Sequence, residues 1–338
     1  MTSQLQVMVV YSLPSKRMLS TEYGETDSDS EIIAKTVVRG LLARGMRATL
    51  FPVREDNISD IANIKADCIF NLIEWCGQDI ALSKKAFTYL RKTGIPVTGS
   101  DEKMFVLTGD KIRVKQELIK LGVPCPKSMV FKTGQDEIRG DLEYPVIVKP
   151  SLEHCSMGLS YDAIAHNKVE LRQIAVRQIK NFHQSALAEE FIVGRELLVY
   201  LLEEQGDVRV LPIEEIVFYG KQELKFQTYE TKWREESEDY NSTDVVRAKL
   251  GKDEKSEIEM ICKKTFIQMG LRGYARFDVR LRNGIPYILE TNANPSVYDA
   301  TDELKNVEDE VIWGIKFCDY LEMIVKMAMT NYQRGWRV

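Results

Sequence analysis

Residues 276–295 constrain the fold most strongly, because they read as two strands joined by a tight turn and carry several hard oxygen ligands. Successive side chains of a strand point to opposite faces. Arg276 and Asp278 therefore share one face of the first strand, and Glu290 and Asn292 share one face of the second. These side chains converge only if the turn between the strands has the right parity.

The turn itself decides that parity. A plain two-residue turn at Asn283-Gly284 would pair Asp278 with Leu289 and put the side chains of Asp278 and Glu290 on opposite faces. A three-residue loop that also includes Arg282, with the glycine left-handed in a bulge, pairs Asp278 with Ile288 and brings the ligands together. We therefore predict the three-residue bulged loop. The convergent ligands would suit a magnesium-nucleotide site, and a solvent-exposed polar hairpin is the alternative.

The composition is that of an ordinary globular protein. The chain has 338 residues, 44% hydrophobic content and a net charge of −5 without a long basic run, which argues against nucleic acid or an anionic membrane as the main partner. Six cysteines without a Cys-x-x-Cys pair, together with only three histidines, indicate neither a zinc cage nor a disulfide framework, so a reducing cytoplasm fits best. The apolar segment Val311 to Met329 is interrupted by charges, which predicts an amphipathic packing helix instead of a membrane span.

The pattern of expected elements divides the chain into three domains. Residues 1–100 alternate buried strands with amphipathic helices, which predicts a parallel α/β domain. Residues 101–192 predict a small α+β unit, and residues 193–338 mix strands with helices around 254–268 and 311–329. Within the last domain, residues 226–245 are polar, charged and aromatic, which predicts a long loop that can serve as a lid or is merely a solvated insertion.

Two lysines stand where phosphate groups could be held. Lys149 ends a buried strand directly before a loop of small residues that contains Ser156 and Gly158. Loop amides and the serine hydroxyl can donate to phosphate oxygens, the lysine supplies a point charge, and the glycine permits close approach. Lys111, beside Asp110 at a helix start, offers a second such charge. The spacing is not that of a P-loop, so ordinary surface lysines are the alternative.

Taken together, short motifs in order along nearly the whole chain resemble the ATP-grasp ligases, and within them the D-alanine–D-alanine ligase family. The motifs are Phe70-Asn-Leu-Ile-Glu74 with Gly77-Gln-Asp79, Gly94-Ile-Pro-Val-Thr-Gly-Ser100, Asp110-Lys111, Pro145-Val-Ile-Val-Lys-Pro150, Glu190-Phe-Ile-Val-Gly-Arg-Glu196, Leu211-Pro-Ile-Glu-Glu-Ile216, Tyr229-Glu-Thr-Lys-Trp233, and Ala275-Arg-Phe-Asp278 through Glu290-Thr-Asn-Ala-Asn-Pro295. The resemblance implies a three-domain ATP-grasp architecture in which the nucleotide lies between the central and C-terminal domains.

The resemblance also implies a role for each matching residue. It assigns the ATP phosphates to Lys111 and Lys149, adenine to Glu189, Glu190, Phe191 and Ile192, ribose to Glu196, two magnesium ions (with manganese as a substitute) to Asp278, Glu290 and Asn292, and catalytic roles to Arg276 at the tetrahedral intermediate, Lys232 in the lid and Ser156 in the loop. In the family reaction a carboxylate attacks the γ-phosphate to give an acyl phosphate, which an amine then attacks. A closed lid keeps the acyl phosphate from water.

The chain departs from the family pattern around the amino-acid sites. The departures are His154-Cys155-Ser156 for Gly-Ser-Ser, Trp233 for tyrosine, Ser296 for glycine, Asn71-Leu-Ile-Glu74 for a His-Gly segment, and an Asp278 to Glu290 interval one residue shorter than usual. A thiol at position 155 is a poor donor, and a small filler residue is the simplest interpretation of it. The acidic cluster from Glu25 to Glu31 could hold a substrate ammonium or cap a helix.

We therefore expect an ADP-forming ligase that joins a carboxylate to an amine, such as two small amino acids. A specialised amide, peptide or ester ligase with another acceptor, and a catalytically lapsed nucleotide-binding protein, are the alternatives. We expect small-molecule substrates, no nucleic-acid or membrane partner, and a cytoplasmic location, with a homodimer as one option for assembly.

Overall fold

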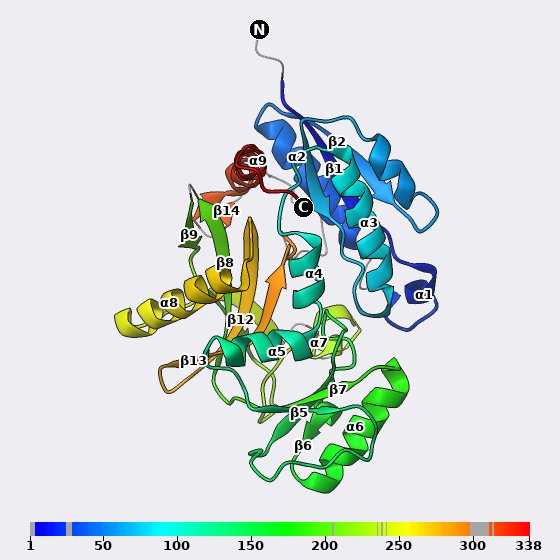
Figure 1. Cartoon of the computed structure of the whole chain (residues 1–338). Helices are drawn as coiled ribbons and strands as arrows, with labels where there is room; N and C mark the ends of the chain where they lie inside the picture. The colour runs from blue at the N-terminus through cyan, green and yellow to red at the C-terminus, as the bar shows by residue number, and fades with distance from the viewer. Residues whose placement is uncertain are drawn as a thin grey trace.

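The computed structural model describes residues 4–24, 29–204, 206–234, 236–237, 239–240, 242–297, 311–312 and 314–338. Three of the four described sheets are arranged along the molecule, with the N-terminal α/β unit at one end, a small antiparallel unit at the other, and a larger sheet between them; the fourth is a two-stranded hairpin (Figure 1). This is the mixed α/β and α+β class that the element pattern predicts. The division at residues 100 and 192 stays a prediction.

The N-terminal unit is built on a parallel sheet in the order β2-β1-β3, and Val97 adds a parallel bridge to Ile69. Along β1, Val7 and Val9 enter the core shared with α2, whereas Val10 enters the core shared with α3, because alternate side chains face opposite sides. The elements are β1 (Gln6–Ser12), α1 (Lys16–Leu19), α2 (Asp29–Ala43), β2 (Arg47–Val53), a 3₁₀ helix (Ile58–Asn63), β3 (Cys68–Leu72), a 3₁₀ turn (Gly77–Asp79) and α3 (Ile80–Thr93).

The central unit is a four-stranded antiparallel sheet in the order β4-β7-β5-β6, with α6 packed on one face. Every residue of β5 is buried, which explains why this strand reads as a continuous apolar run ending in a lysine. The elements are α4 (Glu102–Thr108), α5 (Lys111–Lys120), β4 (Ser128–Phe131), β5 (Val146–Pro150), a 3₁₀ turn (Tyr161–Ala163), β6 (Ile164–Ala165), α6 (Lys168–Phe182) and β7 (Ala186–Glu190).

The larger sheet runs in the order β11-β10-β8-β12-β13, with β9 paired to β8. One face packs against α4, α5 and α8, and part of the other face packs against the N-terminal unit and α9. The elements are β8 (Arg195–Glu204), β9 (Asp207–Val210), β10 (Glu214–Phe218), α7 (Tyr229–Trp233), β11 (Thr243–Arg247), α8 (Lys252–Met269), β12 (Tyr274–Arg282), β13 (Ile285–Ala293), β14 (Val311–Ile312), β15 (Ile315–Lys316) and α9 (Phe317–Gln333).

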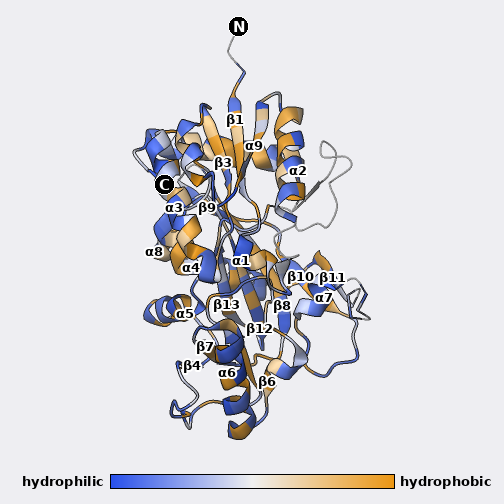
Figure 2. Cartoon of the chain, turned by 90° about the vertical axis from the view of Figure 1, so that its right-hand side faces the viewer, coloured by the Kyte–Doolittle hydropathy of each residue, from blue (hydrophilic) through white to orange (hydrophobic). Residues whose placement is uncertain are grey.

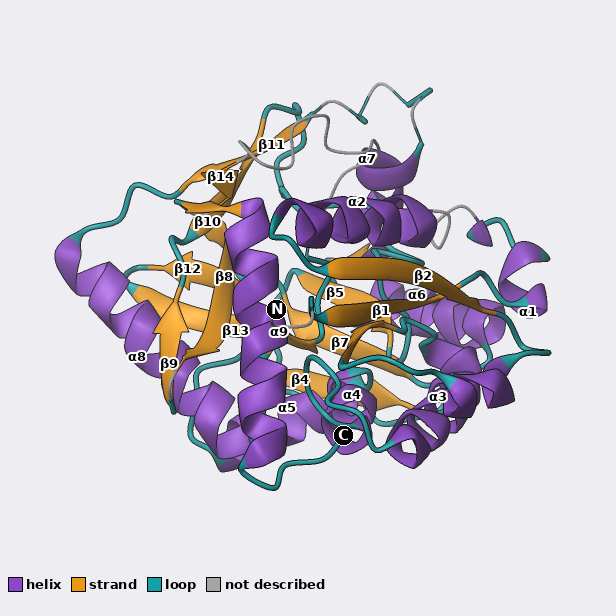
Figure 3. Cartoon of the chain, turned by 90° about the horizontal axis from the view of Figure 1, so that it is seen from above, coloured by secondary structure: helices purple, strands orange, loops and turns teal. Residues whose placement is uncertain are grey.

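Helix α9 returns the end of the chain to the N-terminal unit and lies beside α2 (Figure 3). Its apolar face, including Phe317, Leu321 and Ile324, is fully buried in the core that also holds Val9. The hydropathy colouring shows the neighbouring strands β1 and β3 as mainly apolar (Figure 2). Among the described residues, no helix is both long enough and apolar enough to cross a membrane.

Several expected elements differ from the structure. The apolar stretch from Val311 begins as the β14–β15 hairpin, and α9 starts only at Phe317. Between β9 and β10 lies Pro212, which cannot donate a ladder hydrogen bond. The loop expected over 226–245 contains α7 and most of β11, and β2 was not predicted at all.

Candidate active site

The hairpin β12–β13 does bring its acidic ligands together, but the predicted loop is wrong. Arg282 pairs with Ile285, so the turn has only two residues, Asn283 and Gly284, both with positive φ (54° and 76°). The register instead shifts between Asp278 and Val279, where β13 accommodates an extra residue.

As a result, Asp278 pairs directly with Glu290, and Arg276 pairs with Asn292. The extra residue in β13 is Leu289, which lies between the partners of Asp278 and Val279. The parity argument therefore required a bulge, and the structure places that bulge inside the strand instead of at the turn.

A cleft of about 690 Å³ lies above this hairpin, between the three parts of the molecule. Arg276 and Asp278 line it from β12, and Glu290 lines it from β13. Of the thirteen residues to which the resemblance assigns a role, Asn292 is the one not among its lining residues. The other twelve line the cleft: Lys111, Lys149, Ser156, Glu189, Glu190, Phe191, Ile192, Glu196, Lys232, Arg276, Asp278 and Glu290.

Alternating charges run along the floor of the cleft. Lys149 Nζ lies 3.0 Å from a carboxylate oxygen of Glu189 and 3.9 Å from one of Glu290, which in turn lies 3.5 Å from Lys111 Nζ. The other oxygen of Glu189 lies 2.7 Å from Lys115 Nζ. The five residues come from α5, β5, β7 and β13, so rigid elements hold the ladder of charges in place.

Burial and neighbouring charges act in opposite directions on these groups. Burial alone would raise the pKa of Glu290, but Lys111 and Lys149 outweigh it and hold that pKa at about 2. Burial likewise would raise the pKa of Glu189, yet Lys115 and Lys149 lower it below its usual value. Burial would lower the pKa of Lys149, but Glu189 and Glu290 raise it. All three groups are therefore charged at neutral pH.

The side of the cleft next to β7 has an aromatic wall. The ring of Phe191 lies 5.7 Å from that of Phe226 in an edge-on arrangement, and Ile192 lines the cleft beside it. The Glu190 carboxylate accepts a hydrogen bond from the backbone N–H of Glu143, outside the cleft residues. Glu196 forms a short ion pair with Arg280. The apolar wall suits a flat heteroaromatic ring, and the nearby carboxylate suits hydroxyl groups on a substituent of that ring.

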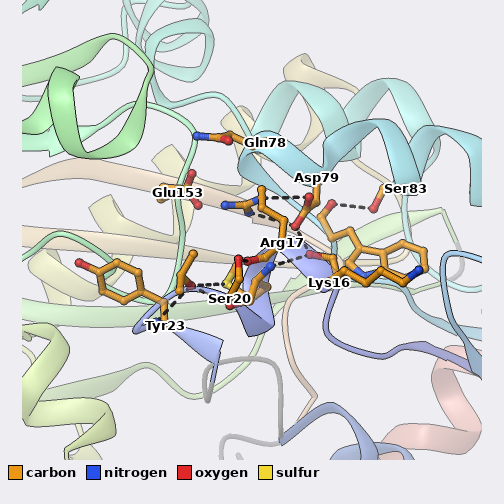
Figure 4. Close-up of polar contacts among 12 residues, drawn as sticks. Lys16, Arg17, Ser20, Tyr23, Gln78, Asp79, Ser83 and Glu153 are labelled. Atoms are coloured by element: carbon orange, nitrogen blue, oxygen red, sulfur yellow. Dashed lines mark hydrogen bonds and ion pairs between the residues drawn. The ribbon is translucent and has the colours of Figure 1, made fainter.

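The loop after β5 connects the cleft to the N-terminal unit. Lys111 donates from its ammonium group to the backbone carbonyl of Glu153, and the Glu153 carboxylate accepts from Gln184 Nε2 at 2.8 Å. Gly77 makes this approach possible, because a Cβ there would lie 2.6 Å from the Glu153 carboxylate oxygens. Figure 4 shows Glu153 beside Arg17, which forms two 3.0 Å hydrogen bonds to Asp79.

The described part of the segment 226–245, for which the sequence predicts a lid or a solvated insertion, lies over the same loop. We refer to it as the lid segment. Helix α7 carries Lys232, which lines the cleft, and Trp233, whose indole N–H donates to the backbone carbonyl of Cys155 at 3.0 Å. Cys155 and Ser156 both have left-handed backbone conformations (φ 55° and 59°). An apolar cluster joins the lid to the other two units through Met18, Tyr23, Met157, Phe182, Tyr229 and Trp233.

The residues of the hairpin fit a magnesium ion that is shared with phosphate groups. Mg²⁺ is usually held by one or two carboxylates together with phosphate oxygens, instead of by an all-protein cage. Asp278 and Glu290 supply two paired carboxylates, and no cluster of three or more His, Cys, Asp or Glu occurs among the described residues. Among the described residues, the buried side-chain nitrogen of Asn292 has no hydrogen-bond partner. This observation fits a side-chain amide oriented so that its oxygen can face a cation.

Sequence reasoning missed Arg280 and Glu153, which line the cleft, and Lys115, which forms an ion pair with Glu189. Lys115 is four residues after Lys111 and therefore on the same helix face, and Arg280 follows Arg276 and Asp278 in the strand alternation, so both could have been found from periodicity. Glu153 carried no such signal. In the acidic cluster, residues 25–28 lie outside the described residues, while Asp29 and Ser30 line the cleft.

The sequence and the fold were compared with those of known proteins. The family model described as the D-ala D-ala ligase C-terminus matches residues 122–325. The crystal structure of the D-alanine–D-alanine ligase from Bacillus anthracis complexed with ATP superposes with a TM-score of 0.71 at 17% sequence identity, covering 98% of this chain and 100% of that one. Fold and cleft together define an ATP-grasp ligase.

The chain belongs to the D-alanine–D-alanine ligase family, because the family model covers more than half of it. The D-alanine–D-alanine ligase of Thermotoga petrophila is 28% identical over 86% of this chain and 90% of its own length. An uncharacterised protein of Sinorhizobium fredii, y4sG, is 35% identical over 62% of this chain, and the match spans 60% of that protein.

Proposed function

We propose that this protein uses ATP to join a carboxylate to an amine through an acyl-phosphate intermediate. The observation that carries the proposal is the buried ladder of charges, in which Lys111 and Lys149 flank Glu290 while Asp278 stands opposite Glu290 on the neighbouring strand. Such an array matches a triphosphate, because lysines and metal-binding carboxylates together neutralise a transferring phosphoryl group. The family membership and the ATP complex of the Bacillus anthracis protein support the same conclusion.

In the proposed arrangement, the nucleotide base lies against Phe191 and Ile192, with Glu189 and Glu190 near the adenine amino group and Glu196 at the ribose. Asp278, Glu290 and Asn292 would hold magnesium, which when bound spreads the negative charge of the phosphates. Lys111, Lys149 and the hydroxyl of Ser156 would hold phosphate oxygens.

The remaining groups serve the second half of the reaction. Arg276 lines the cleft beside Asp278 and would stabilise the negative oxygen that develops when the amine attacks the acyl carbon. Lys232 would complete the positive end of the cleft when the lid is closed, and the lid would exclude water from the acyl phosphate. Two small amino acids are the substrates we propose.

The decisive experiment measures ADP release with Mg²⁺ over pairs of D- and L-amino acids and small amines, with each product identified by mass spectrometry. We expect ADP and an amide product in equal amounts for at least one pair. ATP binding without turnover for any pair would instead support a nucleotide-binding protein whose catalysis has lapsed. Turnover only with an unrelated amine or alcohol acceptor would support a specialised amide or ester ligase.

A further inference from the structure

Arg280 is a buried arginine at the wall of the cleft that none of the proposed chemical roles uses. It lies on β12, on the same face as Arg276 and Asp278, and only 4% of its surface is exposed. Burying a guanidinium group is costly unless its charge is paired and its donors are satisfied. The partners that satisfy Arg280 therefore show what the structure uses it for.

Those partners come from two separate segments, residues 191–196 and Lys225. The guanidinium forms a short ion pair with the Glu196 carboxylate, donates to the carbonyl of Lys225 at 2.5 Å, and donates to the carbonyl of Gly194 at 3.1 Å. Its central carbon lies 5.1 Å from the centroid of the Phe191 ring, within the range of a cation–π contact.

Gly194 is required for one of these contacts. A Cβ at this position would lie 2.3 Å from the carbonyl oxygen of Leu281, the residue that follows Arg280. Only glycine lets the two backbones approach so closely. The segment between Phe191 and Glu196 is thus held directly against β12, within reach of the guanidinium.

These partners connect two parts of the proposed site. Phe191 and Glu196 line the end of the cleft proposed for the nucleoside, and Lys225 is the last residue before the lid segment 226–245. Arg280, Phe191 and Glu196 also line a second cavity of about 550 Å³, whose walls include Lys225. The guanidinium therefore stands in the wall that separates the nucleoside end of the cleft from the root of the lid.

We propose that Arg280 is a positioning residue that fixes Glu196 and Phe191 for the nucleoside and, through the same guanidinium, anchors the root of the lid. This inference rests on the proposed function. A planar guanidinium can serve several acceptors at once in a fixed geometry, whereas a lysine ammonium is a compact point charge on a flexible stem. One side chain thereby makes nucleoside binding and lid placement depend on each other.

The test compares Arg280→Met with Arg280→Lys in two measurements, the KM for ATP and the ratio of ADP released to ligated product. Methionine preserves much of the packing volume but supplies no donor. We expect its KM for ATP to rise at least about tenfold, because both Glu196 and Phe191 lose their partner. We also expect more than one ADP per product, because a displaced lid admits water to the acyl phosphate.

The lysine variant separates the two roles. It can still pair with Glu196, so we expect it to recover part of the ATP affinity, but it cannot serve both carbonyls as well and the excess of ADP should persist. Arg282→Met is the matched control, because Arg282 lies on the same strand and contacts the hydroxyl and ring of Tyr287. It should leave the KM and the product ratio unchanged.

A double-mutant cycle combines Glu196→Gln with Arg280→Met. If Arg280→Met folds poorly, Arg280→Lys takes its place in the cycle, so the proposal can still be tested. We expect the two substitutions together to raise the KM for ATP by much less than the product of their separate effects. A wild-type protein that neither binds nor hydrolyses ATP would overturn the proposed function itself. An active wild type with unchanged KM and product ratio in Arg280→Met would overturn this inference alone.

Discussion

The nucleotide end and the acceptor end of the cleft are built in different ways. At the nucleotide end, Lys111, Lys149, Glu189 and Glu290 come from helices and strands, and each lies within 4 Å of an opposite charge. At the acceptor end, the walls are mainly the loop 151–158 and the short helix α7, with Glu74 and the start of α2 from the N-terminal unit. Charges on regular elements fix one end, and loop contacts shape the other.

This difference indicates where the protein can vary without losing its chemistry. Buried charges tolerate little change, because removing one partner leaves the other uncompensated in a medium of low polarity. Loops accept new side chains more readily. Most departures from the family pattern, among them Cys155, Trp233 and Ser296, fall at the loop-built end. At the charged end the named residues match the pattern, and the departure is the Asp278 to Glu290 interval, which is one residue shorter. We therefore expect the proposed phosphoryl transfer to be the constant part of this protein's chemistry and the choice of acceptor to be the variable part.

The largest effect should come from the hairpin ligands. Asp278→Asn or Glu290→Gln should lower kcat at least about a thousandfold, because each removes a carboxylate proposed to hold magnesium at the phosphates. The thermal unfolding temperature should fall only modestly in Asp278→Asn and further in Glu290→Gln, where Lys111 loses its 3.5 Å carboxylate partner. The exposed Asp56→Asn is the control. Unchanged turnover in both hairpin variants would show that the charged end does not perform the chemistry.

The next largest effect concerns the innermost charge of the ladder. Lys115→Met should lower the free energy of unfolding by about 3–5 kcal/mol, because Glu189 is fully buried and loses its 2.7 Å partner. Adding Glu189→Gln should recover part of that loss, since Lys149 alone then no longer has to balance the buried carboxylate. Urea denaturation measures both. Lys120→Met, at an exposed ion pair, should change the free energy of unfolding by less than about 1 kcal/mol. If the double variant were no more stable than Lys115→Met alone, the ion pair between Lys115 and Glu189 would not be the source of the lost stability.

The charged end was also the easier one to predict from the sequence. Strand alternation and the Asn-Gly turn restrict the hairpin to a few registers. Among these, a register with one bulge places Asp278 and Glu290 on the same face. The sequence could not show where the bulge falls, because a turn bulge and a strand bulge at Leu289 both restore parity. Likewise, Lys149 is recognisable at the end of an apolar run, whereas its partnership with Glu189 depends on the pairing of β5 with β7.

The loop-built end was less predictable, for a physical reason. The contact between Trp233 and the carbonyl of Cys155 joins residues 78 positions apart through two loops whose shape no periodicity specifies. The apolar cluster that contains Met18 and Tyr229 joins three units in the same way. The start of α9 at Phe317 was missed because an apolar run does not reveal where a preceding hairpin ends.

An effect of intermediate size tests the boundary between the two ends, at His154. Burial, and then Lys111, lower the pKa of this histidine to about 4. Between about pH 6.5 and pH 4, the unfolded chain binds a proton at His154 that the folded protein does not bind. The free energy of unfolding is therefore unaffected by His154 above pH 6.5 and decreases as the pH falls to about 4. The loss amounts to roughly 3 kcal/mol.

His154→Asn should therefore flatten the dependence of the free energy of unfolding on pH between about 6.5 and 4. Urea titrations at several pH values measure this slope for the wild type and the variant. The exposed His166→Asn is the matched control and should keep the wild-type slope. An identical slope in all three proteins would show that His154 is not held neutral by its surroundings.

The smallest effect should come from the lid contact, and it tests whether the loop-built end sets acceptor choice. Trp233→Tyr removes the indole N–H that reaches the Cys155 carbonyl at 3.0 Å, a hydrogen bond worth about 1 kcal/mol. We expect kcat/KM to change several-fold between acceptors while the KM for ATP stays nearly constant. Cys155→Ala keeps the carbonyl and should leave acceptor preference close to that of the wild type. An equal fall for every acceptor would mean that Trp233 only closes the lid, and that selection of the acceptor lies deeper in the cleft.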